Sequence, residues 1–325
     1  MAKLKNYNGK FCESDYEEAI LSYLEEEGWN YLAGSQVSRT FYRDVLIVDD
    51  MKSFLSKTNP DLLPDEVQQI IDTVKLVGAE SDFATLHKVY GWMVNGMQFT
   101  PKDGLARMVN LIDFENPQNN IFCAVNQFSV EYTNNGKNEV RIPDILLYVN
   151  GLPLCIIELK SPSEPNAKIF NAYEQITILY WRDIPHLLHY CPLACISDGV
   201  KTRLGTVRTP YEHFYAWRRV NDGDKVSTLP FEETKTMIKG VYRPVRLLEI
   251  FRDYIYFQDS EFDSEEKEIV FKLKHRDFAY YNICLKDWHV ESGTYEILVG
   301  ASSQDIRLEK EIIIVIQYKH QNVIN

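Results

Sequence analysis

Residues 141–162 of the chain read RIPDILLYVNGLPLCIIELKSP. Two strongly apolar runs flank an Asn-Gly pair, which is the strongest short-range sequence signal for a β-hairpin. Strands this apolar belong in the middle of a sheet, where both faces are covered. Three charged residues, Asp144, Glu158 and Lys160, nevertheless stand at the outer ends of the hairpin. The stretch therefore predicts a buried strand pair that carries charge for a reason other than folding.

The register of the hairpin decides whether these charges can act together. Side chains alternate between the two faces of a strand, so Glu158 and Lys160, two residues apart, share one face. Asp144 joins that face only if two residues that pair across the hairpin have numbers with an even sum, such as 144 and 158. A plain two-residue loop at Asn150-Gly151 would pair 149 with 152, which is an odd sum. We therefore predict a three-residue loop with a bulge, in which Gly151 is left-handed, or an equivalent bulge nearby.

The chemistry of the three charged residues suits a metal-dependent nuclease, which is one of two interpretations of this stretch. Two carboxylates at one end of a hairpin repel each other unless a proton or a cation lies between them, and hard oxygen ligands favour Mg²⁺. Asp144 and Glu158 are the candidate ligands. Lys160 beside them would orient a nucleophilic water and stabilise charge that develops on a phosphate. The structural alternative is that Glu158 and Lys160 form an ion pair at a strand end while Asp144 caps a turn.

The composition is that of a globular protein with an acidic balance. The chain has 325 residues, of which 45% are hydrophobic and 25% charged, and its formal net charge is -12. This charge opposes unaided binding to nucleic acid, because such binding depends on Lys and Arg that neutralise phosphates. The six cysteines are scattered, without a CxxC pair or a Cys/His cluster that would indicate zinc. No apolar run suits a signal peptide or a membrane span, so we expect a cytoplasmic protein.

Hydrophobic periodicity indicates an α/β domain with a mixed central sheet flanked by helices. The first helix is expected at 14–27, where Ser14 fits an N-cap and Glu17 completes a capping box. The further elements expected in this domain are helices within 59–98, strands over 120–160, a helix at 166–180, a strand at 193–200 and a helix at 211–220.

After about residue 260 the pattern changes to strands without helical periodicity. The strand-like runs are 266–273, 294–300 and 308–318. The charged stretch FQDSEFDSEEK precedes them and is the best candidate boundary. We therefore expect two domains, 1–258 and 259–325, with the second made of β-structure only.

The order Pro-Asp, hairpin, Glu-x-Lys resembles the PD-(D/E)xK nuclease motif. Its surroundings, 14–258, are similar to the N-terminal nuclease domain of the type I restriction enzyme motor subunit. The blocks that carry this similarity are NPDLLP, NLIDFENPQNNIFCAVNQFSVEY, RIPDILLYVNGLPLCIIELKSP, AYEQITILYWRDIPHLLHY, ISDGVKTRLGT and TPYEHFYAWRRV. The resemblance implies a RecB-like restriction-endonuclease core in which Asp144 and Glu158 bind Mg²⁺ and Lys160 assists catalysis.

The resemblance also implies a Gln and a Tyr on the following helix, matching Gln175 and Tyr180, and an acid on the first helix, matching Glu17. In the usual Q-x-x-x-Y pattern the Tyr follows the Gln by four residues, but Leu179 holds that place here. Five residues turn an ideal helix by about 140° beyond a full turn. Gln175 and Tyr180 can therefore share a face only across a bulge or a frayed end. The alternatives are a core role for Tyr180 and a capping role for Glu17.

Basic residues that follow the core are the candidates for phosphate contact in an otherwise acidic chain. They are Lys201, Arg203, Arg208, Arg218 and Arg219. The alternative is a solvated helix face without a ligand.

In the family that the chain resembles, the nuclease domain continues into an ATP-driven translocase, which needs a phosphate loop of the type G-x-x-x-x-G-K-[ST]. The sequence has no such motif, so ATP is expected only for a motor that this chain lacks. The partners implied are double-stranded DNA and the modification and specificity subunits, with little or no cleavage by the chain alone. A second hypothesis keeps the fold as a docking module that does not cut.

The tail, 265–308, resembles the latter half of the fibronectin III-like domain that ends family 3 glycoside hydrolases. A full sandwich needs about seven strands, and fewer are expected here, so an apolar face would be left to pack on another surface. We favour a truncated or artificially fused reading frame, with a protein-interaction appendage as the alternative. A third hypothesis, an accessory module of a carbohydrate enzyme, rests on the tail alone.

Overall fold

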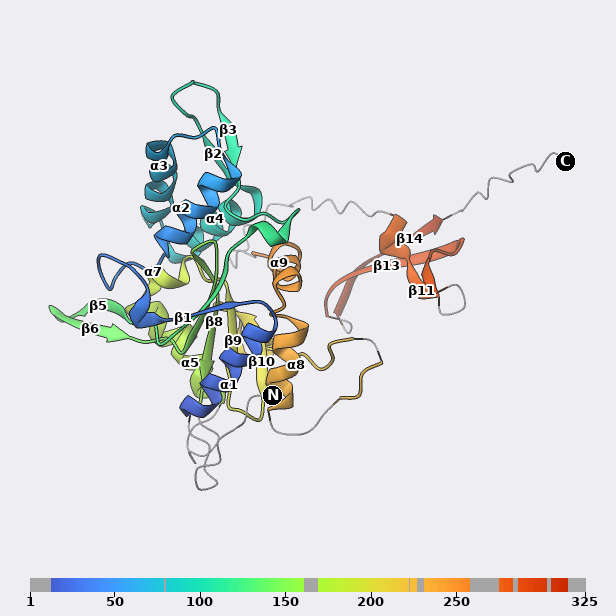
Figure 1. Cartoon of the computed structure of the whole chain (residues 1–325). Helices are drawn as coiled ribbons and strands as arrows, with labels where there is room; N and C mark the ends of the chain where they lie inside the picture. Colours follow the sequence, from blue (N-terminus) through green and yellow to red (C-terminus); the bar gives the residue numbers. More distant parts are fainter. Residues whose placement is uncertain are drawn as a thin grey trace. The chain divides into compact units, whose positions relative to one another are not determined.

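The computed structural model divides the chain into two compact units, Met1–Gln258 and Asp259–Asn325. The first unit holds the α/β part of the chain, and the second holds strands (Figure 1). The residues that the structure describes are 13–78, 80–160, 169–221, 223–226, 231–257, 275–282, 286–302 and 305–314.

A six-stranded mixed sheet forms the centre of the first unit, in the order β1-β4-β7-β8-β9-β10. Its strands are β1 (Asn30–Ala33), β4 (Phe122–Asn126), β7 (Ile145–Val149), β8 (Leu152–Leu159), β9 (Leu193–Ser197) and β10 (Thr202–Thr206). The pairs β1 with β4 and β8 with β9 are parallel, and the other neighbours are antiparallel. Every residue of β7, β8 and β9 is buried. The predicted α/β class with a mixed central sheet is therefore confirmed.

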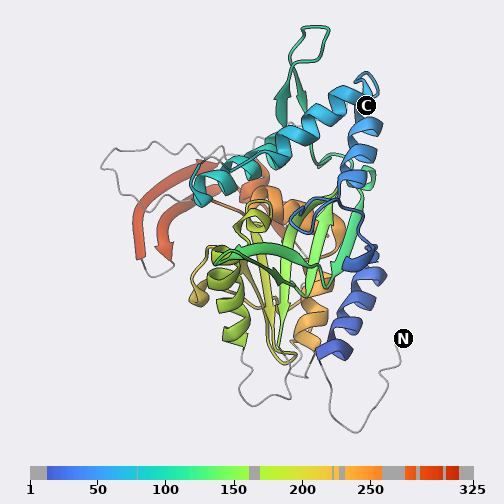
Figure 2. The ribbon, with the colours of Figure 1, turned by 90° about the vertical axis from the view of Figure 1, so that its left-hand side faces the viewer.

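Helices cover both faces of this sheet (Figures 1 and 2). They are α1 (Glu13–Glu26), α5 (Ile169–Glu174), α6 (Trp181–Asp183), α7 (Pro185–Leu188), α8 (Glu232–Gly240) and α9 (Pro244–Asp253). Leu159 pairs with Ser197, so these two side chains share a face, and Ser197 forms a 2.6 Å hydrogen bond with Tyr16 of α1. Glu158 points to the opposite face, where Tyr180 donates to it. The chain that follows β8 therefore lies on the face opposite α1.

A helical layer lies at one end of the sheet (Figure 1). It contains α2 (Val48–Thr58), α3 (Pro64–Lys75), α4 (Asp82–Asn95) and the hairpin of β2 (Met97–Phe99) and β3 (Arg107–Val109). The turn of the β7-β8 hairpin meets this layer, because the backbone nitrogen of Ile47 donates to the Gly151 carbonyl at 3.0 Å. Asp144 and Glu158 consequently lie at the other end of the sheet. Between β4 and β7, the strands β5 (Val130–Asn134) and β6 (Lys137–Arg141) form a separate hairpin.

The β7-β8 hairpin contains the predicted bulge, but in the strand and not in the loop. Near the loop, Val149 pairs with Leu152, an odd sum, whereas further out Ile145 pairs with Ile157, an even sum. The register shifts beside Leu147. The even sum places the side chains of residues 144 and 158 on one face, as the chemistry of the hairpin requires.

The hairpin loop is a tight two-residue turn. Asn150 and Gly151 both adopt positive φ, 51° and 79°, as a two-residue turn of this hand needs. The left-handed Gly151 and the nearby bulge are confirmed. The three-residue form of the loop is wrong, because Asn150 itself takes the left-handed conformation and the extra residue is accommodated within β8.

The helix expected at 211–220 is wrong. Only Tyr211–His213 form a short 3-10 turn, after which the chain is extended. Tyr215 and Leu204 exchange two backbone hydrogen bonds of 2.9 Å, which extends the sheet beyond β10 by one bridge. The Phe214 ring packs where a side chain at Gly205 would lie. Packing on the sheet edge thus overrides the helical pattern of the sequence.

The described part of the second unit consists almost entirely of paired strands. The strand β11 (Tyr280–Asn282) pairs with β12 (Asp287–His289), and β13 (Gly293–Ser302) pairs with β14 (Asp305–Ile314), both antiparallel. The strand run expected at 294–300 lies within β13. β14 contains the first part of the run at 308–318, while 266–273 and the end of 308–318 lie outside the described residues. Over the residues that are described, the tail is β-structure, with one short 3-10 turn at His275–Phe278.

Candidate functional site

The charged residues of the hairpin lie where β8 ends and β7 begins. The Oδ2 atom of Asp144 accepts a 2.7 Å hydrogen bond from the backbone nitrogen of Leu159, which fixes the carboxylate against the end of β8. The register places Asp144 on the same face as Glu158. Carboxyl ends of strands in α/β sheets are common positions for ligands. The two acids are therefore neighbours in a place suited to a binding site.

Glu158 is the centre of the cluster and is only 1% exposed. Tyr180 donates from Oη to Glu158 Oε2 at 3.0 Å. The ammonium of Lys160 lies 3.5 Å from Glu158 Oε1, and Gln175 Nε2 donates to that same oxygen. Each of these three side chains was a candidate site residue in the sequence, and the structure brings all three to one carboxylate.

Gln175 links the members of the cluster. Its Oε1 accepts a 2.8 Å hydrogen bond from Lys160 Nζ, while its Nε2 donates to Glu158 and, at 2.8 Å, to Tyr180 Oη. An ammonium can only donate and an ionised carboxylate can only accept, so a single orientation of the amide satisfies both. Gln175 therefore holds Lys160 beside Glu158.

A π-helical turn gives Gln175 and Tyr180 their common face. After α5, residues Gln175–Tyr180 form this turn, and α6 follows directly. Hydrogen bonds in a π turn join residues five apart, so side chains with that spacing lie one above the other. The five-residue spacing, which an ordinary helix would place on different faces, here serves a single carboxylate.

Burial and charge both act on the ionisation of the cluster. Burial raises the pKa of Glu158 well above its usual range, the charge of Asp144 raises it further, and Lys160 opposes the shift. Burial and the charge of Glu158 raise the pKa of Tyr180, so this phenol stays protonated and can donate. Two neighbouring carboxylates in a buried setting are thus stable together only with a proton or a cation in addition to Lys160.

The donor set of Asp144 and Glu158 fits Mg²⁺. Proteins usually bind this ion through one or two carboxylates, with waters and substrate phosphates as the remaining ligands. Among the residues that the structure describes, no group of three or more His, Cys, Asp or Glu side chains forms a ligand set. A structural zinc site would need such a group, since zinc takes four protein ligands there.

Glu17 is linked to the backbone of Asp144 through the residues at the end of β4. The carboxylate is buried, and its two oxygens accept hydrogen bonds from Asn126 Nδ2 at 2.6 Å and Gln127 Nε2 at 2.8 Å. The backbone nitrogen of Gln127 in turn donates to the Asp144 carbonyl at 2.9 Å. This use of both oxygens favours a tertiary role for Glu17 over the capping box, and α1 begins at Glu13, one residue before the expected cap.

Sequence reasoning missed Asn126 and Gln127. The signal was present, because this polar pair directly follows the apolar run FCAV, just as the hairpin acids stand at strand ends. Ser197 was also missed: its carbonyl accepts from the Lys160 backbone nitrogen at 2.8 Å, and its hydroxyl bonds to Tyr16 and Thr202. Nothing in the local sequence marks its contacts with Tyr16 and Lys160, because these two partners are distant along the chain.

The basic residues predicted for DNA contact lie on β10 and in the chain on either side of it. The guanidinium of Arg203 lies 5.4 Å from the centre of the Tyr211 ring, and that of Arg208 lies 4.4 Å from the centre of the Trp181 ring. Lys201, Arg218 and Arg219 are exposed. The hydrogen bonds described around Glu158 involve none of the five, so their role stays a prediction.

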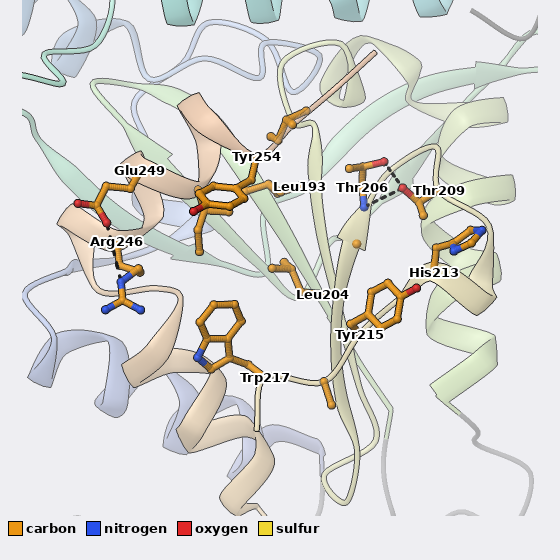
Figure 3. Close-up of a pocket in the computed structure, with 14 residues that line it drawn as sticks. Leu193, Leu204, Thr206, Thr209, His213, Tyr215, Trp217, Arg246, Glu249 and Tyr254 are labelled. Atoms are coloured by element: carbon orange, nitrogen blue, oxygen red, sulfur yellow. Dashed lines mark hydrogen bonds and ion pairs between the residues drawn. The ribbon is translucent and has the colours of Figure 1, made fainter. Parts of the chain in front are cut away.

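A cavity of about 590 Å³ lies apart from the acid cluster, at the open edge of the sheet (Figure 3). Its walls come from β10, from the extended chain after residue 213 and from α9 and the residues that follow it. Neither Asp144 nor Glu158 lines it.

In the part of the chain that the structure describes, no helix has both the length and the apolar character of a membrane span.

Comparison with known families finds two matches in different parts of the chain. The family described as type I restriction enzyme R protein N terminus matches residues 10–213, and the fibronectin type III-like domain matches residues 263–303. The chain is 30% identical over 272 residues to the type I restriction enzyme HindI endonuclease subunit of Haemophilus influenzae. The matched residues make up 79% of this chain and 25% of that protein.

Two further relatives extend the comparison. A provisionally named type I restriction endonuclease subunit of Methanocaldococcus jannaschii, MjaIXP, is 29% identical over 321 residues, 94% of this chain and 30% of that protein. The thermostable beta-glucosidase B of Acetivibrio thermocellus is 56% identical over 48 residues, 15% of this chain and 6% of that protein. The chain thus spans less than a third of the length of either restriction subunit.

Proposed function

Because the chain belongs to the family of type I restriction enzyme R protein N termini, we propose that its first unit is a nuclease domain with a RecB-like core. The domain would hydrolyse phosphodiester bonds of double-stranded DNA in a Mg²⁺-dependent reaction. The observation that carries this proposal is the convergence of Lys160, Gln175 and Tyr180 on the buried Glu158 carboxylate, beside Asp144.

Each residue of the cluster has a role in this proposal. Mg²⁺ held by Asp144 and Glu158 would polarise a phosphate oxygen and favour hydroxide formation from water. Lys160 is kept in place by Gln175 at the partly exposed rim of the cluster, where its ammonium would orient the attacking water and stabilise charge on the phosphate. Tyr180 and Gln175 would fix the Glu158 carboxylate by donating to its two oxygens.

Glu17 would act as a positioning residue in the same proposal. Through Asn126 and Gln127 it holds the end of β4, to which the backbone of Asp144 is hydrogen-bonded. Loss of its carboxylate would loosen the position of Asp144 without removing a metal ligand. Five basic residues are proposed to contact DNA phosphates, which suits their charge in an acidic chain and the exposure of all of them except the half-buried Arg203: Lys201, Arg203, Arg208, Arg218 and Arg219.

We propose further that cleavage takes place in a complex with modification and specificity subunits. The support is that the relatives are named as endonuclease subunits of type I restriction enzymes and are more than three times as long as the matched part. ATP would be used by translocase parts of such a subunit and has no proposed role in the first unit. The second unit is proposed to be an appendage, from a fused reading frame or for interaction, with no part in cleavage.

The alternative is a docking module that keeps the fold and does not cut. Its grounds in the sequence are the five-residue spacing of Gln175 and Tyr180 and the missing phosphate loop of a motor. The π turn gives that spacing a common face, so this observation now favours the enzyme.

A plasmid-nicking assay tests the proposed function. The chain would be incubated with supercoiled plasmid and Mg²⁺ or Mn²⁺, alone and with modification and specificity subunits. We expect metal-dependent nicking that Asp144→Ala and Glu158→Ala both abolish, while Glu174→Ala, which changes a neighbouring acid outside the cluster, retains it. Nicking that persists in EDTA or in both cluster variants would contradict the proposal, as would its absence under every condition.

A further inference from the structure

The cavity at the open edge of the sheet has the size and lining of a small-molecule site. Its volume of about 590 Å³ falls within the range of roughly 300 to 1,000 Å³ that such sites occupy. The floor is aliphatic and includes Leu193, Leu204 and Ile250. A floor of this kind favours a ligand with a flat apolar surface.

Aromatic rings surround this floor. Figure 3 shows Tyr215, Trp217 and Tyr254 set around Leu204. The two tyrosines are 66% and 74% exposed, so most of their ring surface is open to contact. The Trp217 ring sits where a side chain at Gly240 would lie, and its Nε1 has no hydrogen-bond partner among the described residues. Packing against Gly240 therefore fixes this ring at the wall of the cavity.

Polar and cationic groups stand at the sides of the cavity. On one side the hydroxyls of Thr206 and Thr209 are hydrogen-bonded to each other, and on the other Arg246 lies 3.9 Å from Glu249, a loose ion pair (Figure 3). Trp217 is followed directly by the exposed Arg218 and Arg219. Stacking surfaces beside cations are the combination that unpaired nucleotides use, because a base stacks on a ring while its phosphate meets a positive charge.

A peptide strand is not a suitable occupant of this edge. Strand addition needs free backbone groups on the edge strand. On β10, Leu204 already exchanges both of its hydrogen bonds with Tyr215. The backbone nitrogens of Thr202 and Thr206 donate to the side chains of Glu233 and Thr209, at 2.9 and 3.3 Å. The backbone groups that would pair with an incoming strand are thus in use.

We propose that this cavity binds an unpaired nucleotide, with the base stacked among Tyr215, Trp217 and Tyr254 and the phosphate near Arg246. The nucleotide could be free or could belong to a single DNA strand, since both present the same base and phosphate. The site is separate from Asp144 and Glu158 and goes beyond the proposed nuclease function. Binding here needs no divalent metal.

The test measures binding of a labelled single-stranded oligothymidylate to the full chain by fluorescence anisotropy, in EDTA. We expect Tyr254→Ala to weaken binding by about 5- to 150-fold, the range found when a stacking ring is removed, and Tyr254→Phe to bind like the wild type. The matched control is Tyr256→Ala, which removes an even more exposed ring, 82%, that does not line the cavity. EDTA excludes cleavage, so the result is independent of nuclease activity.

Two competitors identify the source of the nucleotide. Displacement of the oligonucleotide by thymidine monophosphate would assign the site to free nucleotides, and displacement only by unlabelled single strand would assign it to DNA; either supports the site. Equal affinity in Tyr254→Ala and Tyr256→Ala would overturn the proposal. Preference for a duplex of the same length would also overturn the proposal, because a paired base cannot stack among these rings.

Discussion

At the scale of single residues, Glu158 combines a functional position with a cost to folding. Burial and the neighbouring Asp144 raise its pKa above the ordinary value of 4.5. The native state therefore holds a proton on Glu158 more tightly than the unfolded state does. The free energy of unfolding must fall as pH rises from 4.5 through the raised pKa, because the native protein then pays to ionise a buried acid.

We expect Glu158→Gln to remove this dependence in metal-free protein. The variant should be at least as stable as the wild type at alkaline pH, and its advantage should shrink as the pH approaches the ordinary value of 4.5. Thermal unfolding in EDTA over a pH series measures it. Glu174→Gln serves as the control and should keep the wild-type slope. Identical slopes for the wild type and Glu158→Gln would show that burial of Glu158 imposes no such cost.

At the scale of elements, the π turn brings Gln175 and Tyr180 to the same carboxylate, that of Glu158. If Gln175–Tyr180 is an α-helix with one residue inserted, then deleting Ile178, which is 54% exposed, restores ordinary four-residue spacing. We expect this deletion to leave the protein folded and metal-dependent nicking intact. The comparison is deletion of the exposed Gln69 from α3, an ordinary helix, which rotates the following core residues by about 100°. Circular dichroism measures how much helix each deletion variant keeps, and the nicking assay measures its activity.

Loss of structure on deletion of Ile178, to the same extent as on deletion of Gln69, would contradict this reading of the turn. The π turn would then be required by packing on its own account. Its coincidence with the five-residue spacing of Gln175 and Tyr180 would need another explanation.

The hairpin turn gives a second prediction at this scale. Gly151 has φ 79°, and a side chain there would collide with the Ile47 carbonyl. Gly136, in the β5-β6 turn, has φ 75° and open space around it. Gly136→Ala should cost only the left-handed strain, about 1–2 kcal/mol. Gly151→Ala should cost about 2 kcal/mol more, because α2 must also move. Urea unfolding measures both, and equal losses would show that the contact with Ile47 is unimportant.

The elements that could be predicted from the sequence are those with a local signal. The β7-β8 register followed from alternation plus the chemistry of Asp144 and Glu158, and the first helix from its periodicity. The segment after Pro210 could not be predicted, because its extended form depends on Leu204 and on the space at Gly205. The partners of Glu17, Asn126 at the end of β4 and Gln127 after it, lie more than a hundred residues away. Contacts of that range leave no trace in local periodicity.

At the scale of the whole molecule, the division at residue 258 predicts that the first unit folds alone. Its hydrophobic core is continuous from α1 to α9. We expect residues 1–258 to unfold cooperatively, with a thermal midpoint within a few degrees of that of the same unit in the full chain, because the described residues of this hydrophobic core all lie before residue 258. Scanning calorimetry of both proteins checks this. A fragment that aggregates or melts much earlier would show that the tail stabilises the first unit.

Calorimetric titration of Mg²⁺ into the full chain tests most directly whether Asp144 and Glu158 form a metal site. The controls are Glu158→Ala and Glu174→Ala. We predict a binding isotherm in the wild type and in Glu174→Ala that is lost in Glu158→Ala, and that strengthens as pH rises because proton and metal compete for Glu158. Equal heats in the wild type and Glu158→Ala would contradict the proposed metal site and with it the nuclease mechanism.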